Sequence, residues 1–316
     1  MSKIVVTGGA GFIGSHLCEA LLRTGSKVVA LDNFDDFYDP SIKRRNLASA
    51  LTKDRFVLVE GDIRNQDAIA EVIDETVDAV VHLAARAGVR PSIDQPLLYQ
   101  DVNVGGTLVL LERCRRFPRC KFIFASSSSV YGNRTKVPFS ETDRVDNPIS
   151  PYAATKRAGE LLCHTYHHLF RMDITCLRFF TVYGPRQRPD LAIYKFARLI
   201  ETGERIPVFG RGGAMRDYTY VDDIVDGVLR AIERCEGYHI YNLGESQPVA
   251  LTDLIRAIEE ALGRKAVIER LPPQPGDVER TYADVTLACR DLGYRPSTDL
   301  TIGLEQFISW LRNEQS

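Results

Sequence analysis

A glycine-rich turn near the start of the chain constrains its fold more than any other feature. Gly8 and Gly11 lie between an apolar run at residues 3–7 and a helix-like repeat at residues 12–23, and Gly14 lies in the first turn of that repeat. Gly8 allows a tight turn, Gly11 lets the backbone approach a pyrophosphate, and Gly14 lets the helix pack closely on a sheet. The start of that helix offers free N–H groups and a positive dipole end to phosphates. The turn therefore predicts a dinucleotide site in a βαβ unit.

An acidic residue stands where such a site needs one. Asp32 ends the predicted second strand, residues 27–32, at the spacing of about 20 residues expected of a ribose-binding carboxylate. A carboxylate accepts hydrogen bonds from a ribose diol and repels a 2′-phosphate, which favours NAD over NADP. Asp62, after the third predicted strand, either contacts the adenine side or caps its own loop. The same site is expected to include neighbours of these motifs: Phe12, Ile13, Asn33, Ile63, Leu83, Ala84 and Ala85.

Short β-rich runs alternate with amphipathic segments through the first half of the chain, which is typical of βαβ units and a parallel sheet. Further strands are expected at residues 56–60, 79–82, 121–125 and 174–178. A helix near 222–235 and a strand near 238–242 predict a return to the sheet. We expect an α/β fold: a Rossmann-type doubly wound parallel sheet with a smaller, discontinuous C-terminal α/β substrate lobe. The expected boundaries are a core of residues 1–180, completed by about 222–243, and a lobe of residues 181–221 and 244–316.

Charge and cysteine content argue against several classes of protein. With 40 Lys and Arg against 42 Asp and Glu, the 316-residue chain has a formal charge of -2 and no overall basic field for nucleic acid. The amino end lacks a signal-peptide pattern, and no apolar run approaches the roughly 20 residues that cross a bilayer. The seven cysteines form no C-x-x-C pair, which disfavours a disulfide framework and a zinc site. We expect a cytoplasmic protein that binds neither nucleic acid, membrane nor metal.

A Tyr-x-x-x-Lys pair marks the candidate catalytic group. Tyr152 and Lys156 begin a predicted helix that Ser150 caps and Pro151 opens, and their spacing puts both on one face. A phenol has a pKa of about 10, which a nearby ammonium, an NAD cation and a helix N-terminus would each lower. One hydroxyl of the serine run at 126–129, at the end of a predicted strand, can share the substrate proton. An exposed i,i+4 pair is the alternative, but the glycine turn favours catalysis.

Together these motifs resemble the extended short-chain dehydrogenase/reductase superfamily. More narrowly, the chain is similar to the UDP-glucuronate 4-epimerases of bacterial surface-polysaccharide and related pathways. The similarity rests on AARAGVRPS at 84–92, ASSSSVYG at 125–132 and FFTVYGPRQRPD at 179–190, and it runs from Lys3 to about Trp310. It implies an NAD-dependent enzyme in which a tyrosine takes the C4 hydroxyl proton and NAD takes the C4 hydride. The 4-keto sugar then turns and receives the same hydride on its other face.

The resemblance also assigns roles to residues of this chain. It implies that Tyr152 is the base, Lys156 its electrostatic partner and Ser127 its hydroxyl partner. It further implies a homodimer formed through the segments that begin near Asp101 and Pro151.

Three hydroxyl side chains bear on the substrate. A 4-keto glucuronate is a β-keto acid, which loses CO2 easily when the C5–carboxylate bond stands perpendicular to the carbonyl. Ser127, Ser128 and Thr181 are the candidates to hold the carboxylate out of that alignment, although Thr181 would also suit an ordinary strand.

Related decarboxylases carry glutamate where this chain has Ser129, and sugar 4,6-dehydratases carry Asp-Glu where this chain has Ser128 and Ser129. The remaining alternatives are a UDP-glucose or other UDP-hexose 4-epimerase, a UDP-glucuronate decarboxylase and an NAD(H)-binding regulator.

The UDP part of such a substrate brings a pyrophosphate, which guanidinium groups bind well. By resemblance, Arg188 and Arg216 occupy nucleotide-side positions, and Asp277 is a candidate to bond the ribose of UDP. Phe209 either stacks on uracil or continues a short strand. Arg90 either pairs with the negative charge of the substrate or lies on the surface.

Overall fold

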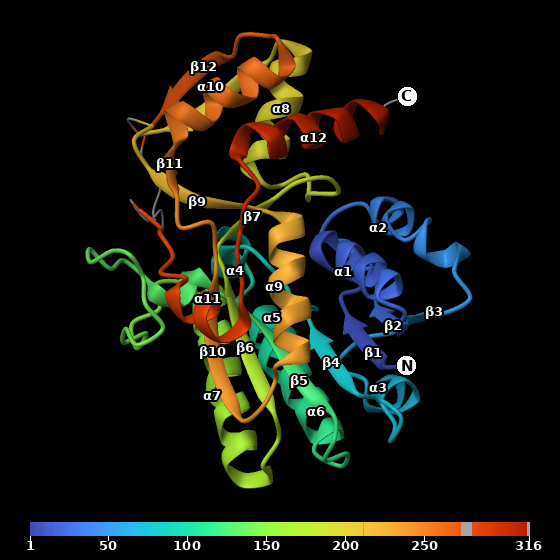
Figure 1. Cartoon of the computed structure of the whole chain (residues 1–316). Helices are drawn as coiled ribbons and strands as arrows, with labels where there is room; N and C mark the ends of the chain where they lie inside the picture. Colours follow the sequence, from blue (N-terminus) through green and yellow to red (C-terminus); the bar gives the residue numbers. More distant parts are fainter. Residues whose placement is uncertain (211, 273–279, 315–316) are drawn as a thin grey trace.

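A seven-stranded parallel sheet forms the centre of the molecule (Figure 1). This computed structural model describes residues 1–210, 212–272 and 280–314. The strand order is β10-β6-β5-β4-β1-β2-β3, and every neighbouring pair is parallel. The strands are β1 (Lys3–Thr7), β2 (Lys27–Asp32), β3 (Phe56–Glu60), β4 (Ala79–His82), β5 (Lys121–Ser127), β6 (Ile174–Phe179) and β10 (Tyr238–Leu243). The predicted doubly wound sheet is confirmed, with β10 returning to its edge.

Helices cover both faces of this sheet, so its strands are buried on both sides. On β1, Ile4 and Val6 pack in a core with α1 and α9, whereas Val5 packs in the core of the opposite face with α3, α6 and α7. Successive side chains of a strand point to opposite faces, which explains this alternation. The helices are α1 (Phe12–Arg23), α3 (Gln66–Val72), α6 (Gly106–Cys114), α7 (Pro151–Phe170) and α9 (Val221–Glu233).

A smaller lobe stands beyond the sheet, at the top of Figure 1. It contains α8 (Ala192–Thr202), α10 (Leu251–Leu262), α12 (Leu300–Asn313) and a parallel pair of strands, β8 (Arg205–Phe209) and β12 (Val267–Leu271). Helix α8 buries Ile193, Phe196, Ala197 and Ile200, the spacing of one helical face. A three-stranded sheet of β7 (Thr181–Tyr183), β9 (Met215–Tyr220) and β11 (Pro248–Ala250) lies between this lobe and the core.

Two differences from expectation bear on the site and on the division into core and lobe. Strand β5 ends at Ser127 rather than at residue 125, so the serine run begins inside the sheet. Helix α11 lies in the segment expected to belong to the lobe, but it packs against β10 and α9 of the core. The short elements are α2 (Pro40–Asn46), η1 (Ala50–Thr52), α4 (Val89–Asp94), α5 (Pro96–Tyr99), the π-helix η2 (Gln100–Gly105), η3 (Ser128–Tyr131) and α11 (Thr286–Leu292).

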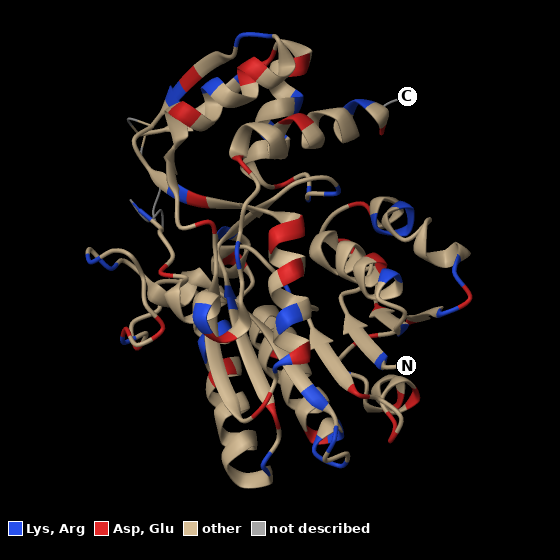
Figure 2. Ribbon diagram, in the orientation of Figure 1, with Lys and Arg blue, Asp and Glu red and all other residues tan. Residues whose placement is uncertain are grey.

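Neither a single-sign charged surface nor a metal-ligand cluster is found among the described residues. Lys and Arg are interspersed with Asp and Glu over the core and the lobe (Figure 2). All seven cysteines are free, and only Cys289 among them is exposed. Within the described ranges, no three His, Cys, Asp or Glu side chains are grouped to hold a metal ion, and no helix is long and apolar enough to cross a bilayer.

Candidate active site

A cavity of about 470 Å³ opens at the carboxyl ends of β1, β2, β4 and β5. Open α/β sheets bind ligands at this edge, where the strand order reverses. The cavity brings together the predicted dinucleotide residues, the predicted catalytic set and four of the predicted substrate contacts, with Ser127 belonging to both of the last two sets. Those that line it are Gly8, Gly11, Phe12, Ile13, Gly14, Asp32, Asn33, Asp62, Ile63, Leu83, Ala84, Ala85, Ser127, Ser128, Tyr152, Lys156, Thr181 and Arg188.

Close backbone packing explains two glycines of the turn beside the cavity. Gly8 has a φ of +71°, and a Cβ on it would lie 2.8 Å from the backbone nitrogen of Ala84. A Cβ on Gly14 would lie 2.1 Å from the carbonyl oxygen of Gly8. Neither position has room for a side chain, so only glycine lets the turn lie this close to the loop after β4 and to the start of α1.

Asp32 is buried at the end of β2, with 7% of its surface exposed. Its Oδ2 accepts a hydrogen bond from the backbone N–H of Ala10 at 3.1 Å, and its Oδ1 accepts one from Phe34 at 2.9 Å. Burial raises the pKa of the carboxyl, which the charge of Lys43 and the two N–H groups oppose. The carboxylate is thus held rigidly at the rim of the turn.

Asp62 both lines the cavity and organises its own loop. Its carboxylate accepts hydrogen bonds from the backbone N–H of Arg64 at 2.8 Å and from the Arg64 guanidinium, which pairs with it at 2.7 Å. It also accepts one from the Asn33 amide at 3.1 Å. These bonds, those from Arg64 above all, lower its pKa to about 2. The local-cap interpretation is therefore realised, and adenine contact stays a prediction.

The start of α7 carries the tyrosine and the lysine. Ser150 caps the helix by accepting a hydrogen bond from the N–H of Ala153 at 3.1 Å, and Pro151 is its first residue, as the sequence predicts. Lys156 is only 4% exposed, and its Nζ donates to the Ala125 carbonyl oxygen at 2.7 Å. The ammonium lies 6.0 Å from the centre of the Tyr152 ring. Both side chains therefore project from one helical face into the cavity.

The protonation of this pair differs from the sequence-based expectation. Burial raises the pKa of Tyr152, and only the Ser127 hydroxyl and the charge of Arg188 oppose it. Burial also lowers the pKa of Lys156 to about 8. The expected net lowering of the phenol pKa is wrong for the polypeptide itself, because desolvation of the phenolate outweighs the nearby charges.

The serine run divides between structural and cavity-facing roles. The Ser126 hydroxyl is buried and donates to the Glu160 carboxylate at 2.6 Å. Ser127 lines the cavity, and its Oγ accepts hydrogen bonds from the backbone N–H of Ser129 at 3.2 Å and from the Ser129 hydroxyl at 2.8 Å. Ser128 also lines the cavity. The end of β5 thus presents hydroxyls, not carboxylates, to a ligand.

A buried ion pair lies behind this site that the sequence did not reveal. Glu160 follows Lys156 by one turn of α7, and its carboxylate pairs with the Arg178 guanidinium of β6 at 2.8 and 2.9 Å. Arg178 also donates to the Tyr131 hydroxyl at 2.9 Å. Its side chain is 1% exposed and that of Glu160 is fully buried. The pair ties α7 to β6 beside the serine run.

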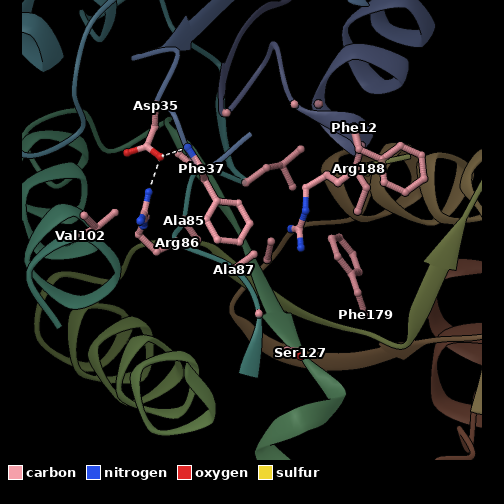
Figure 3. A pocket seen from close by; sticks show the side chains of 18 of the residues that line it. Phe12, Asp35, Phe37, Ala85, Arg86, Ala87, Val102, Ser127, Phe179 and Arg188 are labelled. Atoms are coloured by element: carbon pink, nitrogen blue, oxygen red, sulfur yellow. Dashed lines mark hydrogen bonds and ion pairs between the residues drawn. The ribbon is translucent and has the colours of Figure 1, made fainter. Parts of the chain in front are cut away.

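Arg188 reaches the cavity from the loop after β7. Its guanidinium donates two hydrogen bonds to the Asp190 carboxylate, at 2.9 and 2.8 Å. In Figure 3 it lies among Phe12, Phe37 and Phe179 and points into the cavity. Thr181, at the start of β7, also lines the cavity.

Three other predicted substrate contacts, Arg90, Phe209 and Arg216, lie outside the cavity lining. The Arg90 guanidinium stacks at 5.2 Å on the ring of Phe209, so α4 of the core contacts β8 of the lobe. Arg216, on β9, donates to the Met215 carbonyl oxygen at 2.9 Å. Asp277 lies outside the described residues.

The cavity residues that were not predicted include four that interact with one another or with the predicted set: Asp35, Phe37, Lys43 and Arg86. Asp35 and Arg86 form an ion pair within the cavity lining, and the Phe37 ring lies near the guanidinium groups of Arg86 and Arg188 (Figure 3). Three of them belong to the segment at 33–46 and Arg86 to the AARAGVRPS motif. The charged residues beside Asp32 were the available signal, but the sequence does not say which of them turn inward.

The fold and this cavity define a Rossmann-type nucleotide-binding protein. The family described as the NAD dependent epimerase/dehydratase family matches residues 4–244. The chain is 46% identical to UDP-glucuronate 4-epimerase 3 of Arabidopsis thaliana over 98% of its own length and 76% of that protein. It is 42% identical to protein CapI of Staphylococcus aureus, with 98% of each chain covered.

Two solved structures support the same family as the sequence matches. The UDP-glucuronic acid 4-epimerase of Bacillus cereus, in complex with UDP-glucuronic acid and NAD, superposes with a TM-score of 0.92 at 37% identity over 99% of each chain. The UDP-glucose 4-epimerase of Thermus thermophilus, in complex with NAD, gives a TM-score of 0.89 at 32% identity over 98% and 99% of the two chains. The chain belongs to the NAD dependent epimerase/dehydratase family.

Proposed function

We propose that this chain catalyses the NAD-dependent, reversible C4 epimerisation of UDP-glucuronate to UDP-galacturonate through a transient 4-keto sugar, without decarboxylation. One observation carries the proposal: Tyr152, Lys156 and Ser127 line the same cavity as the glycine turn and Asp32. Relatives named UDP-glucuronate 4-epimerase, at 46% identity in one case, support the choice of substrate.

The residues of the cavity fit NAD. The turn is so close-packed that a Cβ on Gly8 or Gly14 would collide with backbone, and it leads directly into α1. Phosphates suit such a helix start, while the fixed carboxylate of Asp32 suits a ribose diol and opposes a 2′-phosphate. Lys156 would hold the nicotinamide ribose. When bound, NAD supplies the group that accepts and returns the C4 hydride.

Tyr152 moves the proton of the C4 hydroxyl. Because burial keeps its pKa above the ordinary value, the phenol on its own holds its proton at neutral pH. The positive charges that favour phenolate are Arg188, Lys156 and the oxidised cofactor. Ser127, whose hydroxyl lies beside the phenol, shares the proton as it moves. The tyrosine therefore acts as a base only when the oxidised cofactor is bound.

Hydroxyl side chains protect the keto acid from losing CO2. Ser127, Ser128 and Thr181 line the cavity and can hydrogen-bond a carboxylate while leaving room for the ring to turn. At Ser128 and Ser129 the chain has no acid that could expel water. This arrangement favours an epimerase over a dehydratase or a decarboxylase.

Guanidinium groups hold the nucleotide. Arg188 already lies in the cavity with a bidentate carboxylate partner, and a pyrophosphate presents the same kind of acceptor. We assign Arg90, Phe209, Arg216 and Asp277 to the UDP end of the substrate. The Arg90–Phe209 contact joins core and lobe, as a ligand spanning the two would require.

Thr181 should control the fate of the keto acid. We expect Thr181→Val, which removes the hydroxyl and keeps the shape, to raise the share of UDP-pentose and released CO2. Carbon balance by sugar-nucleotide NMR measures this share. Thr202→Val, on α8 in the lobe, is the matched control and should leave the product purely epimeric. A fully epimeric product from the Thr181 variant would remove the carboxylate-holding role.

A homodimer in the cytoplasm, serving polysaccharide biosynthesis, completes the proposal. Three leucines on the helices that cover the core are exposed to solvent. Leu108 of α6 exposes 40% of its surface, and Leu161 and Leu169 of α7 expose 52% and 62%. Exposed apolar side chains on two helices that contact each other suit an interface. We expect light scattering to give twice the chain mass, and a monomer would refute this.

The function is tested with purified protein and UDP-glucuronate, without added reductant. Sugar-nucleotide NMR should show UDP-galacturonate forming until the two sugars reach equilibrium. Formation of UDP-xylose, or turnover of UDP-glucose alone, would replace the proposal with one of its alternatives.

A further inference from the structure

Lys43 is unusual among the basic residues of its helix. Helix α2 ends with Lys43, Arg44 and Arg45. Arg44 and Arg45 are on the surface, where each pairs with a glutamate. Lys43 instead is 7% exposed and lines the cavity. A buried ammonium is costly unless it has partners, so its inward position calls for a local reason.

The partners of Lys43 fix its ammonium beside Asp32. Nζ donates to the backbone carbonyl oxygen of Asp35 at 2.8 Å and lies 5.0 Å from the centre of the Tyr38 ring. From that position it is 3.9 Å from Oδ1 of Asp32. It therefore acts on Asp32 as a charge, while the N–H groups of Ala10 and Phe34 supply the hydrogen bonds.

The electrostatic balance at Asp32 depends on this charge. Burial is the largest influence on the carboxyl and raises its pKa; Lys43 is the strongest opposing one. The other charged or titratable groups that act on the pair are Asp35, Tyr38, Cys18, Arg86 and Arg188. The carboxylate of Asp35 is itself paired with Arg86, which leaves Lys43 as the counterion of Asp32.

We propose that Lys43 is a positioning residue for the cofactor, which keeps Asp32 ionised and aligned to receive the hydroxyls of a nucleotide ribose. The inference rests on the NAD site proposed above and deepens it. An ionised Asp32 accepts hydrogen bonds from both ribose hydroxyls, whereas a protonated Asp32 would accept fewer and would no longer repel a 2′-phosphate. Because Lys43 favours the ionised form, the strength of NAD binding should depend on this lysine. Lys43 contacts Asp32 and not the reacting atoms.

The test measures NAD affinity against pH for Lys43→Gln, by calorimetry on the full chain freed of bound nucleotide. Glutamine removes the charge and keeps an N–H donor for the Asp35 carbonyl, on a side chain one bond shorter. We expect NAD to bind about tenfold more weakly at neutral pH. Because the Asp32 pKa rises further without Lys43, affinity should begin to fall at a higher pH than in the unmodified protein. The difference should therefore widen as the pH is lowered from about 8 towards about 5.

Two variants separate charge from structure. Lys43→Arg keeps the charge and should recover most of the affinity. Lys27→Gln makes the same change at the exposed start of β2, the strand that ends at Asp32, and should bind NAD like the unmodified protein. The inference is overturned if Lys43→Gln matches Lys27→Gln, if its loss of affinity is equal at every pH, or if arginine restores nothing. Failure of the unmodified protein to bind NAD would instead overturn the proposed function.

Discussion

Tyr152→Phe should lower kcat by about a thousandfold or more while leaving the binding of the UDP-sugar nearly unchanged. The substitution removes one oxygen from a ring that is packed edge-on against Tyr99, with ring centres 6.3 Å apart, so the cavity keeps its shape. What is lost is the only phenol that the described cavity lining places beside Ser127 and Lys156. Steady-state kinetics and calorimetry with UDP-glucuronate measure the two effects separately.

A second tyrosine provides the control for this prediction. Tyr194 packs edge-on against Phe307 and Trp310 in the lobe. Tyr194→Phe makes the same chemical change away from the cavity and should keep kcat within about twofold. Equal activity of the two variants would eliminate Tyr152 as the base.

Breaking the buried Glu160–Arg178 pair should destabilise the fold more than any other substitution considered. Burial acts to raise the pKa of Glu160, but hydrogen bonds from Arg178 and Ser126 hold it below its ordinary value, so the carboxylate is charged. Arg178→Met leaves that charge buried without its main partner, which should lower the free energy of unfolding by about 3–5 kcal/mol. Urea denaturation measures the loss.

Two comparisons show whether the effect comes from the unpaired charge. Arg178→Met with Glu160→Leu removes both charges and should be more stable than the single variant, because a buried pair can be replaced by apolar side chains. Arg115→Met breaks the surface pair with Glu112 and should cost about 1 kcal/mol or less. A loss at Arg178 no larger than that at Arg115 would contradict the account.

The parts of the fold set by local patterns were predictable from sequence. The first strand, the glycine turn and α1 depend on neighbouring residues, so their bounds match the structure. The same holds for Ser150 and Pro151 at the start of α7. The cavity followed because parallel strands bring Asp32, Ser127 and the turn to one edge of the sheet.

The parts set by distant contacts were not predictable. Lys43 turns inward and Arg44 outward on the same short helix, and only the packed structure decides which. Glu160 and Arg178 meet across a helix and a strand without a sequence pattern. The pKa of Tyr152 was misjudged because its burial depends on the whole site, whereas the sequence shows only the nearby charges.

The central claim is that one hydride leaves C4 and returns to the same carbon while Tyr152 exchanges its proton with the oxygen. Incubation with UDP-glucuronate carrying deuterium at C4, followed by NMR and mass spectrometry of the product, tests it most directly. The account predicts UDP-galacturonate that keeps the deuterium at C4, in ordinary water and without added cofactor beyond a catalytic amount. Product with hydrogen at C4, or with deuterium at another carbon, would contradict it.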